Sequence, residues 1–242
     1  MRLKVAGVTD VGLKRENNQD YFLVVDDLGL YVVADGMGGH QGGEVASKLA
    51  AQTIEEVVRK SWKEDQGVSP YDLLQRAYTS ASKNIYEMSQ SNSNLKGMGT
   101  TAVTVLMRNN KLFIGNVGDS RVYLIHPPYI WQMTDDHSLL NEQIRAGLIK
   151  PENAPQFMAK NVITRSVGFE RVVHCDVLER ELQEGDYILM CSDGLSGQVT
   201  DRRICDICLT IPFDDVAPRL IEEAKRNGGD DNISAIFIQV VT

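Results

Sequence analysis

The sequence has 242 residues, of which 43% are hydrophobic, and its formal net charge is -8. A chain of this length buries roughly 70–75% of the surface that its unfolded state exposes, so we expect one domain over residues 1–242 whose core needs no cross-links. The acidic charge argues against binding to nucleic acid and to an anionic membrane, and neither a signal peptide nor a membrane-spanning apolar run is evident, so we expect a cytoplasmic protein.

The N-terminal half predicts strands, then two helices, then strands again. Apolar runs flank turn signals such as Asp26-Asp27-Leu28-Gly29 and Asn109-Asn110, which is typical of β-hairpins. Apolar residues at helical spacing mark two helices on either side of a break at residues 67–70. In chain order the elements are strands 3–9, 21–25 and 30–34, helices from near residue 44 and over 71–90, and strands 101–107, 112–116 and 122–125.

The C-terminal half is less regular at its start. Residues 135–170 show little periodicity apart from a short helix expected at 139–146, and such long segments are often binding loops or lids. The remaining elements are strands 172–182 and 186–191, helices 201–209 and 214–226, and strand 233–241. Strands in hairpins and helices in pairs indicate an α+β fold, with an antiparallel sheet or sandwich flanked by helices.

Aspartates next to glycine recur where apolar strands end. They occur at Asp35-Gly36, Gly118-Asp119 and Asp193-Gly194, and Asp231 precedes the last strand. A single Asp-Gly pair most often marks a turn, but four such sites beside apolar strands suggest one carboxylate cluster. Clustered carboxylates repel one another unless a cation neutralises them. Oxygen-only ligands favour Mg²⁺, Mn²⁺ or Ca²⁺ over Zn²⁺.

Three other features have weaker interpretations. The guanidinium of Arg15 suits bidentate capture of a phosphate, although an isolated arginine is usually a surface residue. Cys205 and Cys208 have the C-x-x-C spacing, but no second pair follows, so we expect buried, reduced thiols. Residues 97–101 resemble a phosphate-binding loop only superficially, because they lack its lysine and precede a strand.

Seven short motifs occur in the order found in one known family. They are Arg15-x-x-Asn18-x-Asp20, Asp35-Gly36-Met37-Gly38-Gly39, Gly99-Thr100-Thr101, Gly118-Asp119-Ser120-Arg121, Asp136-His137-Ser138, Ser192-Asp193-Gly194-Leu195 and Asp231-Asn232-Ile233-Ser234. Together they resemble the bacterial type 2C (PPM) protein phosphatases over nearly the whole chain. The resemblance implies a central antiparallel β-sandwich of two sheets, with pairs of antiparallel helices on both outer faces and a flap at about residues 139–165.

The resemblance also implies roles for the acidic residues. Asp35 should bridge two metal ions, the Gly36 carbonyl should bind one of them, and Asp193 and Asp231 should hold the other. Asp20 should orient metal-bound water. Asp119, with Asp193, matches a position that supports a third, weaker ion, and Arg15 matches the arginine that binds the substrate phosphate.

Two residues depart from the pattern of eukaryotic members of that family. Gln19 stands where many of them have a glutamate that contributes to the metal site. Met37 stands where they have a histidine proposed as general acid, and His40 is the nearest replacement in this sequence. Solvent is the alternative source of the proton for the leaving group.

We therefore expect a Mn²⁺- or Mg²⁺-dependent phosphatase that hydrolyses phosphoserine and phosphothreonine by attack of a metal-activated water. Phosphorylated proteins, including a cognate Ser/Thr kinase and its substrates, are the expected partners of a monomer that binds neither nucleic acid nor membrane. A non-catalytic phosphoprotein-binding module on the same fold and a metal-dependent nuclease are the alternatives.

Overall fold

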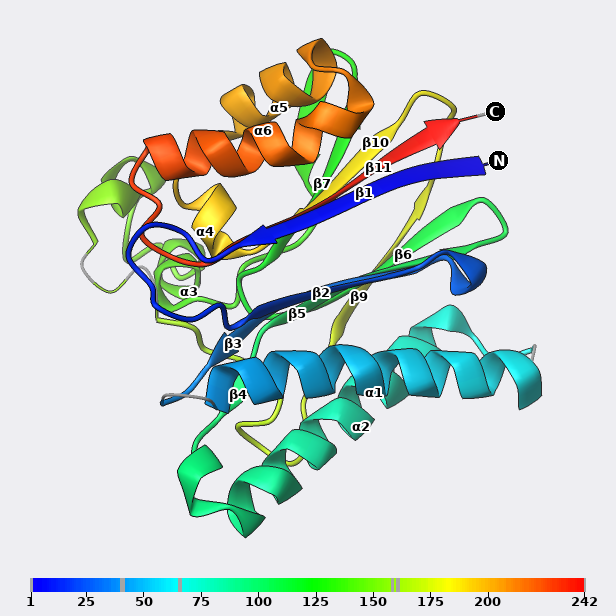
Figure 1. Ribbon diagram of the computed structural model, residues 1–242, viewed down its shortest axis with the longest axis vertical. Coiled ribbons are helices and arrows are strands. Elements are labelled where there is room, and N and C mark those ends of the chain that lie inside the picture. The colour runs from blue at the N-terminus through cyan, green and yellow to red at the C-terminus, as the bar shows by residue number, and fades with distance from the viewer. Residues whose placement is uncertain (1, 40–41, 65–66, 158, 160–161, 242) are drawn as a thin grey trace.

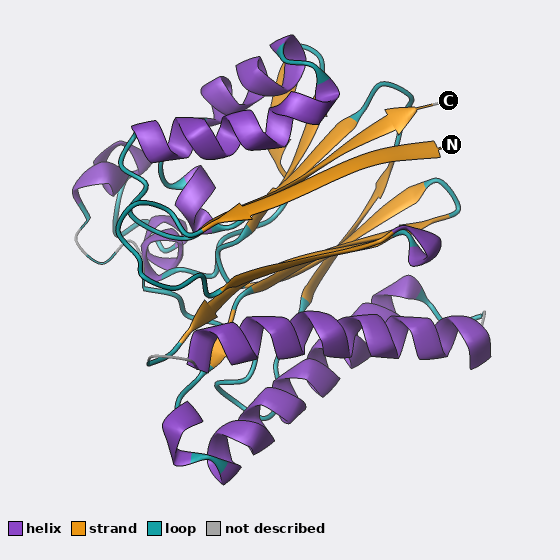
Figure 2. Ribbon diagram, in the orientation of Figure 1, coloured by secondary structure: helices purple, strands orange, loops and turns teal. Residues whose placement is uncertain are grey.

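The computed structural model describes residues 2–39, 42–64, 67–157, 159 and 162–241. Two antiparallel β-sheets stack face to face at its centre, and each outer face carries a pair of helices (Figures 1 and 2). The layers are therefore α-β-β-α, and the α+β sandwich expected from the sequence is confirmed. No helix in the described ranges is long and apolar enough to cross a membrane.

The two sheets draw their strands from distant parts of the chain. In spatial order the first contains β1 (Arg2–Asp10), β11 (Ile233–Val241), β10 (Tyr187–Cys191), β7 (Arg121–His126) and β8 (Tyr129–Gln132). The second contains β2 (Asp20–Val25), β3 (Leu30–Met37), β5 (Ala102–Arg108), β6 (Lys111–Val117) and β9 (Asp176–Glu181), with the short β4 (Gly99–Thr100) paired to β3. The expected hairpins β2–β3 and β5–β6 are both present.

The helices cover the two sheets in pairs. Helices α1 (Gly42–Glu64) and α2 (Pro70–Ser91) lie on the second sheet, and α5 (Asp201–Thr210) and α6 (Phe213–Arg226) lie on the first. Two shorter helices, α3 (Leu139–Arg145) and α4 (Asp193–Ser196), lie near one end of the sandwich. Short 3₁₀ helices occupy Asp26–Leu28, Ser93–Leu95 and Pro151–Gln156.

The central strands are apolar on both faces because each sheet is covered on both sides. On β10, Ile188 and Met190 join the core between the sheets, whereas Leu189 and Cys191 join the core under α5 and α6. On β3, Val33 faces the sandwich and Val32 faces α1 and α2. This double burial explains why these strands read as continuous apolar runs without alternation.

Several details differ from the expectations. The chain turns at Pro127-Pro128 and returns as β8, so the prolines join two strands where only the end of one was expected. Strand β9 begins at Asp176 instead of residue 172, and the one-turn helix α4 was not predicted. Cys205 and Cys208 are buried free thiols, as expected for core residues of α5.

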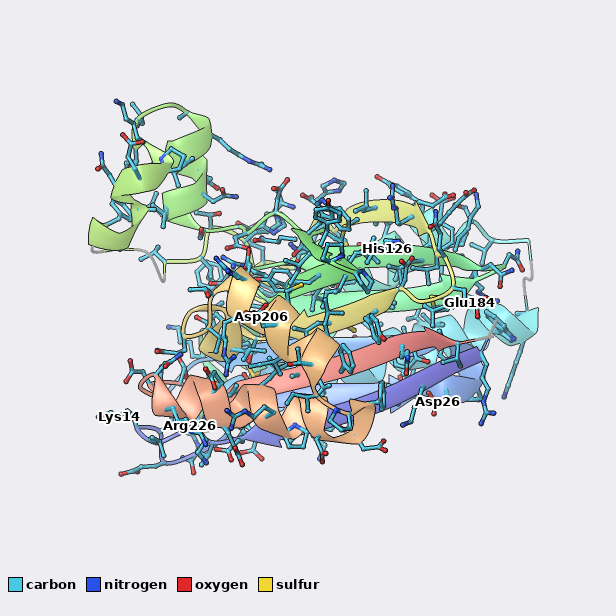
Figure 3. The ribbon with its side chains drawn as sticks, turned by 90° about the horizontal axis from the view of Figure 1, so that it is seen from above. Lys14, Asp26, His126, Glu184, Asp206 and Arg226 are labelled. Atoms are coloured by element: carbon cyan, nitrogen blue, oxygen red, sulfur yellow. The ribbon has the colours of Figure 1, made fainter. Side chains whose placement is uncertain are left out.

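One end of the sandwich gathers polar loops. It is the end to the left in Figure 1, away from both chain termini, where β2 and β11 begin and where β3, β6 and β10 end. The segment that carries α3 projects from the body near this end, as Figure 3 shows from above. Each of the predicted acidic residues lies at one of these strand ends.

Candidate metal centre

The predicted acidic residues surround one pocket of about 320 Å³. The predicted residues that line it are Arg15, Asp35, Gly36, Asp119, Asp193 and Asp231. Asp20 lies beside them, because it is directly opposite Asp35 in the register of β2 and β3. The structure thus brings together the predicted site residues that it describes, whereas His40 lies outside the described residues.

The motif Gly99-Thr100-Thr101 fixes the backbone at Asp35. The Asp35 N–H donates to Thr101 Oγ1 at 3.0 Å, and the Asp35 carbonyl accepts from Thr101 N and Thr100 Oγ1, both at 2.8 Å. Both threonines are buried. Because the main chain of Asp35 is satisfied in this way, its carboxylate is the group available to a ligand in the pocket.

Gly36 is required by close packing. A Cβ atom at this position would lie 2.0 Å from Gly43 O and 2.7 Å from Gln19 O, which no side chain tolerates. The first turn of α1 therefore approaches the end of β3 closely, and glycine is the residue that permits this.

A buried serine links three strands at the site. Ser192 Oγ donates to Asp20 Oδ2 at 2.7 Å and accepts from Ser234 N at 3.0 Å. Asp193 follows Ser192 directly and is the first residue of α4. The Ser192 hydroxyl thus connects Asp20 of β2 with Ser234 of β11, and Ser192 itself is the residue before Asp193. The sequence motif contained Ser192, but sequence reasoning gave it no role.

The carboxylates are in an environment that disfavours their charge. Burial, together with neighbouring carboxylates, raises the pKa of Asp20 and of Asp119 to about 7. Burial and the charges of Asp20 and Asp193 raise the pKa of Asp35 well above its usual value. The pKa of Asp193 is also raised, by burial first and by Asp231 second. A cation in the pocket would reverse these shifts, because it favours the ionised forms.

Two oxygens of this cluster lack compensation. Asp20 Oδ1 and Asp193 Oδ1 are buried, and neither has a hydrogen-bond partner among the described residues. An unsatisfied buried carboxylate oxygen is costly, so it calls for a ligand such as a hard cation.

The described side chains do not yet form a closed cage. No three His, Cys, Asp or Glu side chains of the described residues stand in the close arrangement of a bound metal ion. The carboxylates instead surround the pocket, and Arg15 Nη2 pairs with Asp231 Oδ2 at 2.7 Å. A cation between the carboxylates would compensate the two orphaned oxygens, and all the side chains offered to it are hard oxygen ligands. The residues therefore fit a centre of divalent cations.

The loop that carries Asp119 is held by His137. Gly118 has a φ of +108° and no room for a Cβ atom, which would lie 2.5 Å from Thr101 Cβ. Gly118 N donates to His137 Nδ1 at 3.0 Å, and His137 N donates to Gly118 O at 2.9 Å. Nδ1 is thus an acceptor, and Nε2 lies 3.1 Å from Asp176 Oδ2. Burial lowers the pKa of His137, which favours the neutral ring.

Asn232 is a site residue that sequence reasoning left without a role. Its Nδ2 donates to the carbonyls of Val11 and Asn17, both at 2.9 Å, and its Oδ1 accepts from Gln19 N at 2.7 Å. The side chain is buried and also lines the pocket. It fixes the loop that presents Arg15 beside Asp231. Its place in the motif Asp231-Asn232-Ile233-Ser234 was the available signal.

The sequence profile described as Protein phosphatase 2C matches residues 13–236, which includes every residue of this pocket. The chain belongs to the protein phosphatase 2C family. It is 35% identical to the serine/threonine phosphatase stp of Listeria monocytogenes serotype 4b, over 96% of this chain and 93% of that protein. The resemblance seen in the seven motifs is confirmed, and the chain is a protein serine/threonine phosphatase.

Solved structures of this family share the fold. The Mycobacterium tuberculosis serine/threonine phosphatase PstP/Ppp superimposes with a TM-score of 0.92 at 32% identity, covering 99% of both chains. The catalytic domain of a serine/threonine protein phosphatase PstP in complex with two manganese ions has a TM-score of 0.88 at 33% identity, again covering 99% of both chains. A two-manganese centre in that protein agrees with the fit of this pocket to divalent cations.

The two departures from the eukaryotic pattern have different surroundings in this protein phosphatase 2C. The Gln19 carbonyl accepts from Gly36 N at 3.1 Å and from Ser47 Oγ at 2.7 Å, so Gln19 links β3 to α1. Its Nε2 donates to Gly38 O at 3.3 Å, so the amide bonds to the backbone of the loop after β3. Met37 lines the pocket and also a second groove beside it.

Proposed function

We propose that this phosphatase works through two Mn²⁺ or Mg²⁺ ions held by its strand-end carboxylates. Asp35 and the Gly36 carbonyl would hold one ion, and Asp35, Asp193 and Asp231 the other. The observation that carries the proposal is the carboxylate cluster with two orphaned buried oxygens and raised pKa values around one pocket. Such a cluster is unfavourable for folding without a ligand, and carboxylates with strongly raised pKa values around one pocket are typical of a functional site.

Divalent ions in this pocket would supply an activated water and neutralise charge on the phosphoryl oxygens. The chain's own residues would do the rest. Arg15 would orient the substrate phosphate, because a guanidinium forms bidentate hydrogen bonds to it and reaches the same pocket. Asp20 would accept hydrogen bonds from water at the centre. Proton delivery to the leaving group by His40 or by solvent stays a prediction.

A third, weaker ion is proposed at Asp119. This residue lines the same pocket as Asp193, and its carboxylate has a pKa raised to about 7 by burial and by the charge of Asp193. Both features favour occupancy by a cation over an empty pair of carboxylates. The loop behind Asp119 is fixed by His137, which would keep the ligand in place.

The biological setting is proposed from the family and from the surface. Phosphorylated proteins are the substrates, and a cognate Ser/Thr kinase with its targets would be the partner system in signal transduction. The net charge of -8 opposes binding to nucleic acid and to anionic membranes. Four buried free thiols suit a reducing compartment such as the cytoplasm. We also propose a monomer of one domain, with residues 139–165 as a flap beside the pocket.

Hydrolysis of p-nitrophenyl phosphate and of a phosphothreonine peptide tests the proposal. We expect turnover with added Mn²⁺, loss of turnover with EDTA, and a loss of at least about 100-fold in Asp193→Ala. Full activity of Asp193→Ala would contradict the assignment of the metal ligands. Binding of the phosphopeptide without turnover by the wild type would favour a non-catalytic module instead.

A further inference from the structure

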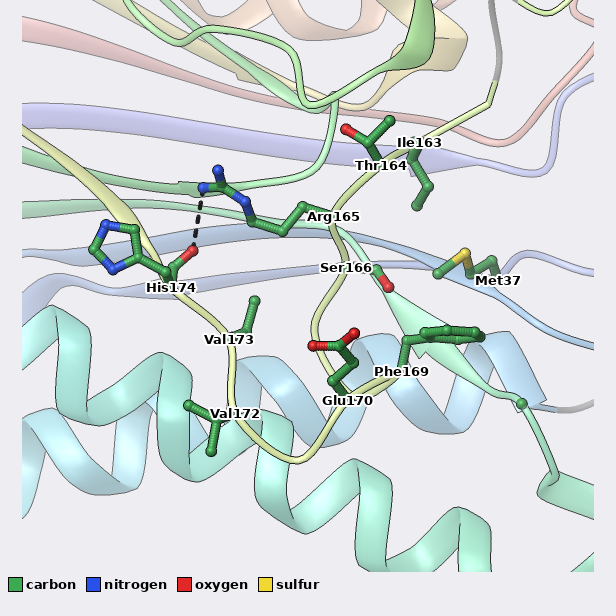
Figure 4. Close-up of a pocket in the computed structure, with 11 residues that line it drawn as sticks. Met37, Ile163, Thr164, Arg165, Ser166, Phe169, Glu170, Val172, Val173 and His174 are labelled. Atoms are coloured by element: carbon green, nitrogen blue, oxygen red, sulfur yellow. Dashed lines mark hydrogen bonds between the residues drawn. The ribbon is translucent and has the colours of Figure 1, made fainter. Parts of the chain in front are cut away.

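A second groove adjoins the catalytic pocket and has no role in the proposed chemistry. Its volume is about 460 Å³, and it shares Met37 and Ile163 with the catalytic pocket as common walls. Its remaining lining comes mainly from residues 163–174, which include the last three residues of the proposed flap and the segment after it (Figure 4). The groove is therefore within reach of the residues that flank a phosphate bound in the catalytic pocket.

The groove exposes apolar side chains. Phe169 and Val172 are each 65% exposed. Exposed apolar side chains that gather in one hollow are unusual on a protein surface and often mark a binding site. Figure 4 shows Phe169 and Met37 toward one end of the groove and Val172 and Val173 toward the other. An apolar side chain of a bound peptide would cover surface here that the folded protein leaves in water.

The wall that carries these side chains is anchored on both sides. Val167 and Thr100 exchange backbone hydrogen bonds of 2.8 and 3.0 Å. Ser82 Oγ, from α2, accepts from Gly168 N at 2.9 Å and donates to Glu170 O at 2.7 Å. The groove is thus formed before any ligand arrives, so binding there carries little cost of ordering the protein.

Two charged side chains line the groove, Arg165 and Glu170. Asp176 balances the charge of Arg165, because Arg165 Nη1 lies 2.6 Å from Asp176 Oδ1. The same Nη1 donates to the His174 carbonyl at 3.2 Å (Figure 4). The Glu170 carboxylate lies between the two apolar ends of the groove, and it has no ion pair or hydrogen bond among the described residues. A basic side chain is its natural partner.

We propose that this groove binds the part of the phosphoprotein substrate next to the phosphorylated residue, and that it selects an apolar side chain accompanied by a lysine or arginine. The inference rests on the proposed phosphatase function. Phe169 and Val172 contact the apolar side chain, and Glu170 pairs with the basic one. These residues set substrate preference and take no part in the hydrolysis itself.

A panel of phosphothreonine peptides tests the groove. Each peptide carries one leucine and one arginine at a different pair of positions within three residues of the phosphothreonine, and serines replace them in the reference peptide. Matched peptides replace only the leucine by serine, or only the arginine by glutamate. We expect the best peptide to exceed the reference by about 10-fold in kcat/KM, as for burial of one apolar group in a pocket. Phe169→Ser should abolish the preference for leucine. Glu170→Lys should reverse the preference of about 3-fold for arginine over glutamate, and this part should fade in high salt.

Matched controls separate the groove from the catalytic centre. Tyr129→Ser removes an aromatic side chain of 61% exposure on β8, and Glu56→Gln removes an exposed carboxylate on α1, so both should leave the peptide preferences unchanged. All four variants should hydrolyse p-nitrophenyl phosphate at the wild-type rate, because that substrate has no flanking residues. Equal kcat/KM across the panel, or an unchanged leucine preference in Phe169→Ser, would overturn the proposal.

Binding provides a readout that does not depend on turnover. Fluorescence anisotropy of the labelled peptides with Asp193→Ala protein should show the same ranking. Absence of turnover on every substrate, with this ranking intact, would reject the proposed chemistry and keep the groove. Self-association of the protein that is lost in Phe169→Ser would assign the groove to a second copy of the chain and overturn the proposal.

Discussion

Arg15 Nη2 and Asp231 Oδ2 lie 2.7 Å apart, which joins the loop after the first strand to the turn that leads into the last strand. The guanidinium is about half exposed, and Asp231, Asp35 and Asp193 all favour its charged form. The same carboxylate is expected to bind a metal ion. An ion bound at Asp231 would therefore compete with Arg15 for this carboxylate, and would release the guanidinium to turn toward a phosphate.

This competition gives opposite expectations for metal and substrate in Arg15→Ala. Affinity for Mn²⁺ should rise by about 2- to 5-fold, the range of a partly exposed ion pair. The kcat/KM for a phosphopeptide should fall by about 10- to 100-fold, because a charge-assisted hydrogen bond contributes about 1.5–3 kcal/mol. Titration calorimetry and steady-state kinetics measure the two effects. Lys14→Ala, on the same loop, is the control, and an unchanged kcat/KM in Arg15→Ala would remove Arg15 from phosphate binding.

The carboxylate cluster predicts how stability depends on pH in EDTA. Burial raises the pKa of Asp20 and Asp119 from 3.8 to about 7, so the folded state binds more protons than the unfolded chain between these values. Stability should therefore be greatest below about pH 4 for these groups and fall as the pH rises to about 7. Melting temperatures in EDTA at pH 5 and pH 8 measure the effect, and saturating Mn²⁺ should suppress it by favouring ionised carboxylates.

Asp20→Asn isolates the contribution of Asp20 from groups whose titration changes stability with pH in the opposite direction. Burial lowers the pKa of His137, so that residue alone would make the protein more stable as the pH rises. The difference between wild type and Asp20→Asn removes this common background. The wild type should lose more stability than the variant between pH 5 and pH 8. Identical slopes would mean that Asp20 does not titrate in this window.

Substitution of Asp119 tests whether this residue binds a third ion and is not a ligand of the two core ions. Asp119→Ala should lower kcat by about 10-fold or more while the two core ions stay bound, because the other ligands remain in place. Metal content after gel filtration and a Mn²⁺ titration of activity measure the two parts. Loss of a core ion would place Asp119 among the core ligands.

The positions of the acidic residues at strand ends were predictable because each lies beside an apolar run, and such a run can be recognised as a strand from neighbouring residues alone. Asp35, Asp193 and Asp231 stand out for that reason, and the hairpin turns do as well. Asn109 and Asn110, with φ of 49° and 61°, form the two-residue turn that their residue types indicate. The order of strands across each sheet is not local information and was not predicted, because the family resemblance implied only two antiparallel sheets with helix pairs outside them.

The residues that sequence reasoning missed depend on long-range contacts. Asn232 bonds to three backbone groups that lie more than two hundred positions away. Ser192 reaches Asp20 in a similar way, across 172 positions. Neither contact leaves a periodic trace in the sequence. Strand β8 was missed for another reason: the two prolines signal an end to one strand, and only the pairing with β7 reveals the next.

Asn232→Ala should show how much the anchoring of this loop contributes to stability and to substrate binding. The variant loses three hydrogen bonds of a buried side chain and leaves partners unsatisfied, so we expect a loss of about 2–4 kcal/mol in the free energy of unfolding. It should also raise KM, because the loop carries Arg15. Asn227→Ala, which loses one bond to the Gln198 carbonyl at the surface, should cost less than about 1 kcal/mol. Urea unfolding measures both, and equal losses would contradict the anchoring role.

His137 should act on turnover through the backbone at Gly118. Its Nδ1 accepts from Gly118 N at 3.0 Å, and protonation or removal of the ring would leave that buried N–H without a partner. His137→Ala should therefore lower kcat in the same direction as Asp119→Ala, with the two core ions still bound. His137→Asn retains an acceptor near the position of Nδ1 and should recover part of kcat, although it cannot also reach Asp176. Recovery of kcat in His137→Asn would indicate that His137 positions the Asp119 loop and does not act only through packing. Equal kcat in wild type and His137→Ala would show that the loop holds its place without this side chain.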